Sequence, residues 1–133
     1  MSATNLKGSN LHLPKVAIIG LGLIGCSWVK ALKLAGCTGS ISGFDRNLDS
    51  MQQALQVGLI DDYSLEITDV VANADLVILS VPILAVGGVL EQIKSSIGEN
   101  TILTDVGSVK GNISKDVSKV LGEEFERFVL GHP

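Results

Sequence analysis

The chain has 133 residues, of which 46% are hydrophobic and 18% charged, so it can bury one core of ordinary size and is not a disordered segment. Its formal net charge of −4 argues against a nucleic-acid partner, because binding to phosphate backbones needs a basic face. The two cysteines, Cys26 and Cys37, lack the spacing of metal ligands. We therefore expect two buried thiols, with a disulfide between them as the alternative, and no metal site.

Residues 1–14 carry no periodic apolar pattern and are predicted to form an N-terminal arm, followed by one domain over residues 15–133. Early in this domain, the residues that end at Cys26 imitate a bacterial lipoprotein cleavage site. The apolar run before this cysteine is far shorter than the ~20 residues that a membrane helix needs. The sequence therefore predicts a soluble cytoplasmic protein without a membrane segment.

Strand and helix patterns alternate along the domain. Short continuous apolar runs predict strands that are buried on both faces, and apolar residues at helical spacing predict helices between them. Strands are predicted over residues 16–19, 40–44, 76–79, 101–105 and 128–130, and helices over residues 24–35, 47–57, 69–73, 84–96 and 108–121; residues 59–67 show no regular pattern. This order indicates an α/β fold of the Rossmann type, a doubly wound, mainly parallel sheet with helices on both faces.

A glycine-rich turn follows the first predicted strand and fits the pattern G-x-G-x-x-G over residues 20–25. In this pattern Gly20 permits a tight turn, Gly22 lets the backbone approach a pyrophosphate, and Gly25 lets the helix pack closely on the strand. Leu23 and Ile24 stand in the first helical turn, whose N–H groups face the phosphates. The sequence therefore predicts a pyrophosphate site at Gly20, Gly22, Leu23, Ile24 and Gly25.

Asp45 stands 20 positions after Gly25, at the end of the second predicted strand. A carboxylate there accepts hydrogen bonds from ribose hydroxyls and repels a 2′-phosphate, which favours NAD over NADP. Arg46 keeps NADP open, because a guanidinium could stack on adenine or attract that phosphate. The alternative is a surface Asp-Arg turn beside an accidental glycine cluster.

Three further motifs stand where predicted strands end. Ser80, Val81 and Pro82 could face the nicotinamide side of a cofactor, or could simply end a strand. Ser108, in the stretch that contains Lys110, could cap a helix and still face a substrate. His132 follows the last predicted strand; a lone terminal histidine usually has no role, yet with an unperturbed pKa near ~6.5 it is well suited to accept a proton near neutral pH.

The motifs TDVGSVKG at residues 104–111 and GHP at residues 131–133 resemble those of the prephenate dehydrogenase family, including its arogenate-using relatives. The resemblance covers residues 16–133 and is to the family's N-terminal nucleotide-binding domain. It implies nicotinamide-dependent oxidative decarboxylation of prephenate to 4-hydroxyphenylpyruvate, or of arogenate to tyrosine, in tyrosine biosynthesis. By this resemblance His132 hydrogen-bonds the ring hydroxyl of the substrate and accepts its proton. Ser108 helps to position that histidine and the hydroxyl, and Lys110 matches a family position without a catalytic role.

Enzymes of that family continue after the GHP motif into a mostly helical domain, which provides dimer contacts and basic residues for the substrate carboxylates. The present chain ends at Pro133. We therefore expect the cofactor-binding half of a homodimeric enzyme, which binds NAD weakly or moderately and turns over little substrate. Two alternatives stay open: another Rossmann reductase of the hydroxyacid or pyrroline-carboxylate group, and a non-catalytic dinucleotide-binding module. The choice between prephenate and arogenate is also open.

Overall fold

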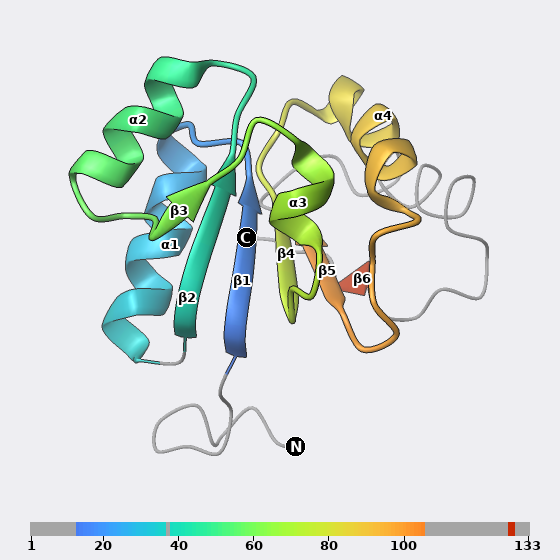
Figure 1. Ribbon diagram of the computed structural model, residues 1–133, viewed down its shortest axis with the longest axis horizontal. Coiled ribbons are helices and arrows are strands. Elements are labelled where there is room, and N and C mark those ends of the chain that lie inside the picture. Colours follow the sequence, from blue (N-terminus) through green and yellow to red (C-terminus); the bar gives the residue numbers. More distant parts are fainter. Residues whose placement is uncertain (1–12, 37, 106–127, 130–133) are drawn as a thin grey trace.

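The structure, a computed structural model, describes residues 13–36, 38–105 and 128–129. Within these residues, six strands form one sheet in the order β3-β2-β1-β4-β5-β6, and every neighbouring pair is parallel (Figure 1). The predicted α/β fold of the Rossmann type is confirmed. The strands are β1 (Leu13–Ile19), β2 (Thr38–Phe44), β3 (Asp62–Tyr63), β4 (Leu76–Leu79), β5 (Ile102–Asp105) and β6 (Phe128–Val129).

The direction of winding reverses between β1 and β4. The chain moves outward from β1 through β2 to β3, then returns so that β4 pairs with the other side of β1. Open α/β sheets bind their ligands at such a switch point, beyond the carboxyl ends of the strands.

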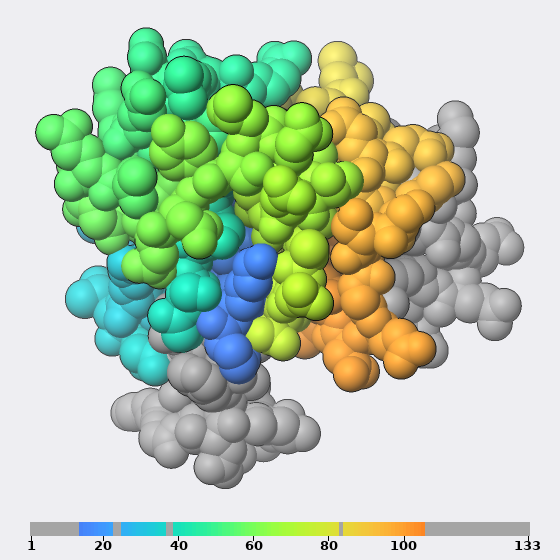
Figure 2. All heavy atoms as spheres, in the orientation of Figure 1, coloured from blue at the N-terminus to red at the C-terminus, as the bar shows by residue number. Residues whose placement is uncertain are grey.

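Four helices cover the described part of the sheet, two on each face (Figure 1). They are α1 (Leu23–Ala35) and α2 (Leu48–Gln56) on one face, and α3 (Ile67–Val71) and α4 (Ile83–Ile93) on the other. In Figure 2, α3 covers the upper part of β1, while the lower part of this strand stays visible. The same arrangement leaves Pro14 exposed and Lys15 half-buried at the start of β1.

β1 is buried on both faces because its side chains alternate between two cores. Val16 and Ile18 pack in the core beneath α1 and α2, whereas Ala17 and Ile19 pack in the core beneath α3 and α4. All four side chains are at most 1% exposed. A strand covered by helices on both sides has no polar face, which explains the continuous apolar run.

Local capping accounts for the ends of two helices. The side chain of Asn47 accepts a hydrogen bond from the backbone N–H of Asp49 at 2.9 Å, so it caps α2 where the sequence predicts its start. Gly36 ends α1 in the left-handed conformation, with φ of 70°, and its N–H bonds to the carbonyl of Lys33. Both residues act as the predicted start and stop signals.

The structure corrects several predicted boundaries. β1 begins at Leu13, inside the predicted arm, and β3 forms in the stretch that shows no regular pattern. α3 starts at Ile67, two residues early, and ends before Asn73, whose φ of 61° is left-handed and not helical. α4 ends at Ile93, before the predicted residue 96. Residues 1–12 of the arm, the helix predicted over residues 108–121 and residue 130 lie outside the described residues.

The described part of the chain has neither a membrane-spanning helix nor a cluster of metal-binding side chains. None of its helices has both the length and the apolar character needed to cross a membrane. Nor do its histidine, cysteine, aspartate and glutamate side chains form a group of three or more that could hold a metal ion.

Candidate functional site

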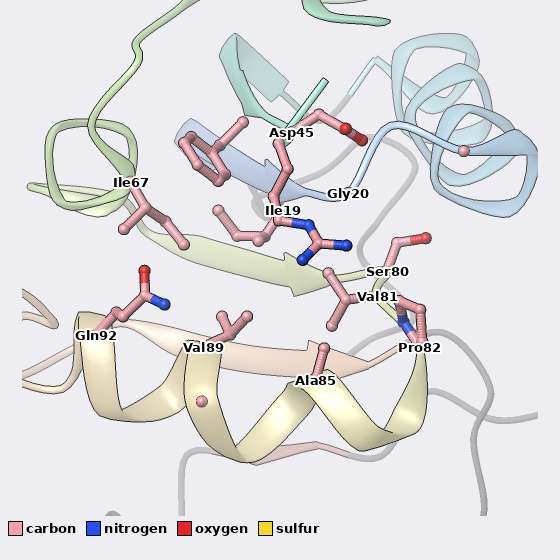
Figure 3. A pocket seen from close by; sticks show the side chains of 14 residues that line it. Ile19, Gly20, Asp45, Ile67, Ser80, Val81, Pro82, Ala85, Val89 and Gln92 are labelled. Carbon is pink, nitrogen blue, oxygen red and sulfur yellow. The ribbon is translucent and has the colours of Figure 1, made fainter. Parts of the chain in front are cut away.

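The register of the sheet brings three strand ends to one edge. Ile19, the last residue of β1, pairs with Phe44 at the end of β2 and with Leu79 at the end of β4. The residues that follow these ends therefore meet at the switch point. A cavity of about 540 Å³ opens there, and Figure 3 shows its lining. Seven of the lining residues were predicted from the sequence as site residues: Gly20, Gly22, Asp45, Arg46, Ser80, Val81 and Pro82.

Gly20 and Gly25 are glycines because the end of β4 lies against them. Gly20 has a φ of +99°, and a Cβ there would lie 2.1 Å from the carbonyl oxygen of Ser80. A Cβ on Gly25 would lie 2.5 Å from the carbonyl oxygen of Gly20 and 2.9 Å from Oγ of Ser80. The glycine turn and β4 therefore pack more closely than any side chain permits.

Gly22 has a different reason to be glycine. Its φ of −78° and ψ of −173° are open to any residue, and a Cβ there would meet no atom of the described residues within 4 Å. Gly22 is exposed, lines the cavity and begins α1 without a side-chain cap. The described residues thus leave the space above Gly22 open, beside N–H groups that the helix does not use. This arrangement fits a phosphate that approaches the backbone.

The carboxylate of Asp45 is held by the backbone on both sides. Oδ2 accepts a hydrogen bond from the N–H of Leu21 at 2.8 Å, and Oδ1 accepts one from the N–H of Asn47 at 2.8 Å. The first bond ties the end of β2 to the glycine turn. Each carboxylate oxygen can accept a further hydrogen bond, so Asp45 can still bind ribose hydroxyls. Arg46 is exposed beside it and also lines the cavity.

The hydrogen bond that Asp45 accepts from the N–H of Leu21 is a structural role that was not predicted from the sequence. Of the two hydrogen bonds of Asp45, the one to the N–H of Asn47 could have been predicted, because an aspartate side chain commonly accepts from the N–H two residues ahead. The longer contact to Leu21 spans 24 positions and depends on the pairing of β1 with β2.

Cys26 lies close to this site in the first half of α1. Its Sγ contacts the carbonyl oxygen of Leu21 at 3.6 Å. Burial raises the pKa of this thiol, the Asp45 carboxylate raises it further, and the Lys30 ammonium lowers it. The thiol is therefore protonated near neutral pH and is a poor nucleophile.

Seven lining residues were not predicted as part of a site. They come from the ends of β1 and β2, from α3 and from one face of α4, and they are Ile19, Phe44, Ile67, Ala85, Gly88, Val89 and Gln92. The available signal was the spacing of Ala85, Val89 and Gln92, which places them on one face of a helix that follows a strand end.

The structure does not describe the side chains of the remaining predicted site residues. Ser108, Lys110 and His132 lie outside the described residues. Leu23 and Ile24 form the start of α1, as the glycine motif predicts, and only their backbone is described.

Comparison with known proteins identifies the family of this chain. Residues 29–133 match the family described as "Prephenate dehydrogenase, nucleotide-binding domain". The chain belongs to this family. The resemblance carried by the TDVGSVKG and GHP motifs is thereby confirmed.

Relatives within the family are about one third identical to this chain over the residues that align. A cyclohexadienyl dehydrogenase from Zymomonas mobilis is 35% identical over 89% of this chain and 40% of its own length. A prephenate dehydrogenase from Aquifex aeolicus, solved in complex with hydroxyphenyl propionate and NAD+, is 34% identical with a TM-score of 0.83. That similarity covers 94% of this chain and 43% of the Aquifex chain.

An arogenate dehydrogenase from Synechocystis is also similar. It is 28% identical with a TM-score of 0.77, and the similarity covers 90% of this chain and 40% of that one. The present chain thus spans about two fifths of the length of each of these relatives.

Proposed function

We propose that this chain is the NAD-binding part of an enzyme that oxidatively decarboxylates prephenate to 4-hydroxyphenylpyruvate. The observation that carries the proposal concerns Gly22, an exposed glycine at the start of a helix and in the wall of a cavity, which no contact with the described residues requires to be glycine. Family membership supports the substrate, and the Aquifex relative was solved with NAD+ and a hydroxyphenyl compound.

Different residues of the chain bind different parts of the dinucleotide. The backbone around Gly22 and the first turn of α1 bind the pyrophosphate through N–H groups and the partial positive charge of the helix terminus. Asp45 accepts hydrogen bonds from the adenosine ribose and disfavours a 2′-phosphate. When bound, NAD supplies the acceptor for a hydride from the substrate. Because Asp45 is fixed by two backbone N–H groups, it cannot turn away to admit a 2′-phosphate without losing both bonds.

His132 and Ser108 are proposed to act on the substrate hydroxyl. The ring carbon that bears this hydroxyl loses a hydride while the imidazole of His132 takes the hydroxyl proton. The bond between the ring and its carboxylate then breaks and releases carbon dioxide. The electron pair of that bond completes the aromatic ring, and the phenolate oxygen takes a proton. Ser108 positions the histidine and the hydroxyl.

Arogenate is the second candidate substrate, favoured by the similarity to the Synechocystis arogenate dehydrogenase. The two reactions share the ring chemistry and differ only in the side chain, a keto acid in prephenate and an amino acid in arogenate. A full-length enzyme assayed with both substrates distinguishes them. The cytoplasmic location, the homodimer and the low turnover of the isolated chain stay predictions.

Calorimetric titration of the chain with NAD and with NADP tests the cofactor assignment. We expect tighter binding of NAD, and a shift of preference toward NADP in Asp45→Ser. The matched control is Asp61→Ser, because Asp61 also accepts a backbone N–H bond, from Ile41 at 2.7 Å, but does not line the cavity. If the wild-type chain binds neither nucleotide, the proposed function is wrong. If Asp45→Ser keeps the wild-type preference, the role of Asp45 is wrong.

A further inference from the structure

The cavity has two chemically different ends. Gly22, Asp45 and Arg46 line the end next to the glycine turn, which is polar and charged. The other end lies between α3 and α4, where Ile67 and Val89 form apolar walls. In Figure 3 the side-chain amide of Gln92 extends from the last turn of α4 toward Ile67, across the open space.

Among the described residues that line the apolar end, Gln92 has the polar side chain. The lining residues that α4 contributes around it are Ala85, Gly88 and Val89, none of which carries a side-chain hydrogen-bonding group. Within the described residues the Gln92 amide makes no hydrogen bond to the protein. Its Oε1 acceptor and its Nε2 donors are therefore available at the edge of an apolar space.

Gly88 lies about one helical turn before Gln92 in α4 and also lines the cavity. It lies inside α4, where glycine is unfavourable relative to alanine, and a Cβ there would meet no atom within 4 Å. Neither backbone strain nor packing within the described residues explains this glycine. Together with Ala85, it leaves α4 a low surface that a flat molecule can approach.

Apolar walls, a low floor and one amide at the edge suit a planar heterocycle with apolar faces and a polar rim. Adenine is such a ring, and a glutamine amide matches its amino edge, since Oε1 accepts from the exocyclic amino group while Nε2 donates to a neighbouring ring nitrogen. We propose that Gln92 recognises the adenine amino group of the bound dinucleotide and so selects for the base. This inference rests on the proposed function and adds a specificity-determining residue to the same site.

The experiment compares NAD with 1,N6-etheno-NAD, whose exocyclic nitrogen carries no hydrogen. Dissociation constants are measured for both dinucleotides with the wild-type chain, Gln92→Leu and Gln92→Glu. Gln52→Leu is the matched control, because Gln52 is an exposed glutamine on α2 that does not line the cavity. The preference for NAD over the etheno analogue is the readout. The two dinucleotides carry the same charge, so the added charge of the Glu variant largely cancels in this ratio.

We expect Gln92→Leu to weaken NAD binding about three- to ten-fold, as for the loss of one or two neutral hydrogen bonds. The preference for NAD over the etheno analogue should fall by a similar factor in Gln92→Leu. Gln92→Glu keeps the hydrogen-bond acceptor, so it should retain more of this preference than Gln92→Leu does. Gln52→Leu should match the wild type in both. Equal preference in the wild type and Gln92→Leu would overturn the inference, whatever happens to NAD affinity. A wild-type chain that binds no NAD would instead refute the proposed function, and the inference with it.

Discussion

Gly22→Ala separates the needs of the fold from the needs of a ligand. The backbone angles at Gly22 suit alanine, and the added methyl group would meet no atom within 4 Å in the part of the chain that the structure describes. Alanine also restricts the unfolded chain more than glycine does. We therefore expect the free energy of unfolding to stay the same or rise by up to about 1 kcal/mol.

The same methyl group occupies the space through which a pyrophosphate would approach the backbone. Forcing one extra carbon into a filled site costs about 1–3 kcal/mol. That range corresponds to a roughly five- to 150-fold weaker affinity for NAD. Urea denaturation measures the first quantity, and calorimetric titration with NAD measures the second.

Gly20→Ala is the contrasting variant, because its Cβ would lie 2.1 Å from the carbonyl oxygen of Ser80 and its φ is +99°. It should lose stability by more than about 2 kcal/mol before any effect on NAD is considered. The reasoning is refuted if Gly22→Ala binds NAD as tightly as the wild type, or if it is as unstable as Gly20→Ala.

Three further variants test other parts of the site. Asp45→Ala removes the acceptor of two backbone N–H groups and should lower the free energy of unfolding by about 2 kcal/mol, measured by urea denaturation. The control is Glu99→Ala, which removes an exposed carboxylate and should change this free energy by no more than about 0.5 kcal/mol. Equal losses in the two variants would contradict a stabilising role for the hydrogen bonds of Asp45. His132→Asn in a full-length enzyme should reduce turnover far more than NAD affinity, and equal losses would contradict its assignment as the base. Because burial and Asp45 raise the pKa of Cys26, less of its thiol is ionised at pH 8 than in an exposed cysteine. In a Cys37→Ser background, iodoacetamide should therefore alkylate Cys26 more slowly than it alkylates glutathione. Adding Asp45→Asn removes the carboxylate charge and should make the alkylation of Cys26 faster than in the Cys37→Ser protein. An unchanged rate would contradict the electrostatic cause.

The sequence predicted the elements whose signal is local. β4 was predicted at its observed bounds, because four apolar residues stand before Ser80 and Pro82. The start of α2 followed from Asn47, a cap that acts within two residues. The glycine motif and Asp45 were found because their spacing reflects the βαβ unit, in which the ends of two strands meet.

The parts that were missed depend on pairing between distant segments. β3 has two residues, too few for any period, and exists because Ser42 and Gly43 of β2 offer it an edge. Ile67 and Gln92 belong to the cavity only because α3 and α4 cover the same face of the sheet. Neither residue lies next to a motif in the sequence, and the helical spacing that links Gln92 to Ala85 and Val89 is also that of an ordinary amphipathic helix.

The contact of β4 with the glycine turn also limits how this protein can change over evolutionary time. Positions 20 and 25 are closed by the backbone and side chain of Ser80, so substitutions there would require β4 itself to move. A Cβ at position 22 would meet no described atom within 4 Å, and Asp45 and Arg46 line the cavity beside it. A library designed to alter cofactor choice should therefore keep Gly20 and Gly25 fixed and vary positions 22 and 46 first, because a change at position 45 also removes the hydrogen bonds that Asp45 accepts from Leu21 and Asn47.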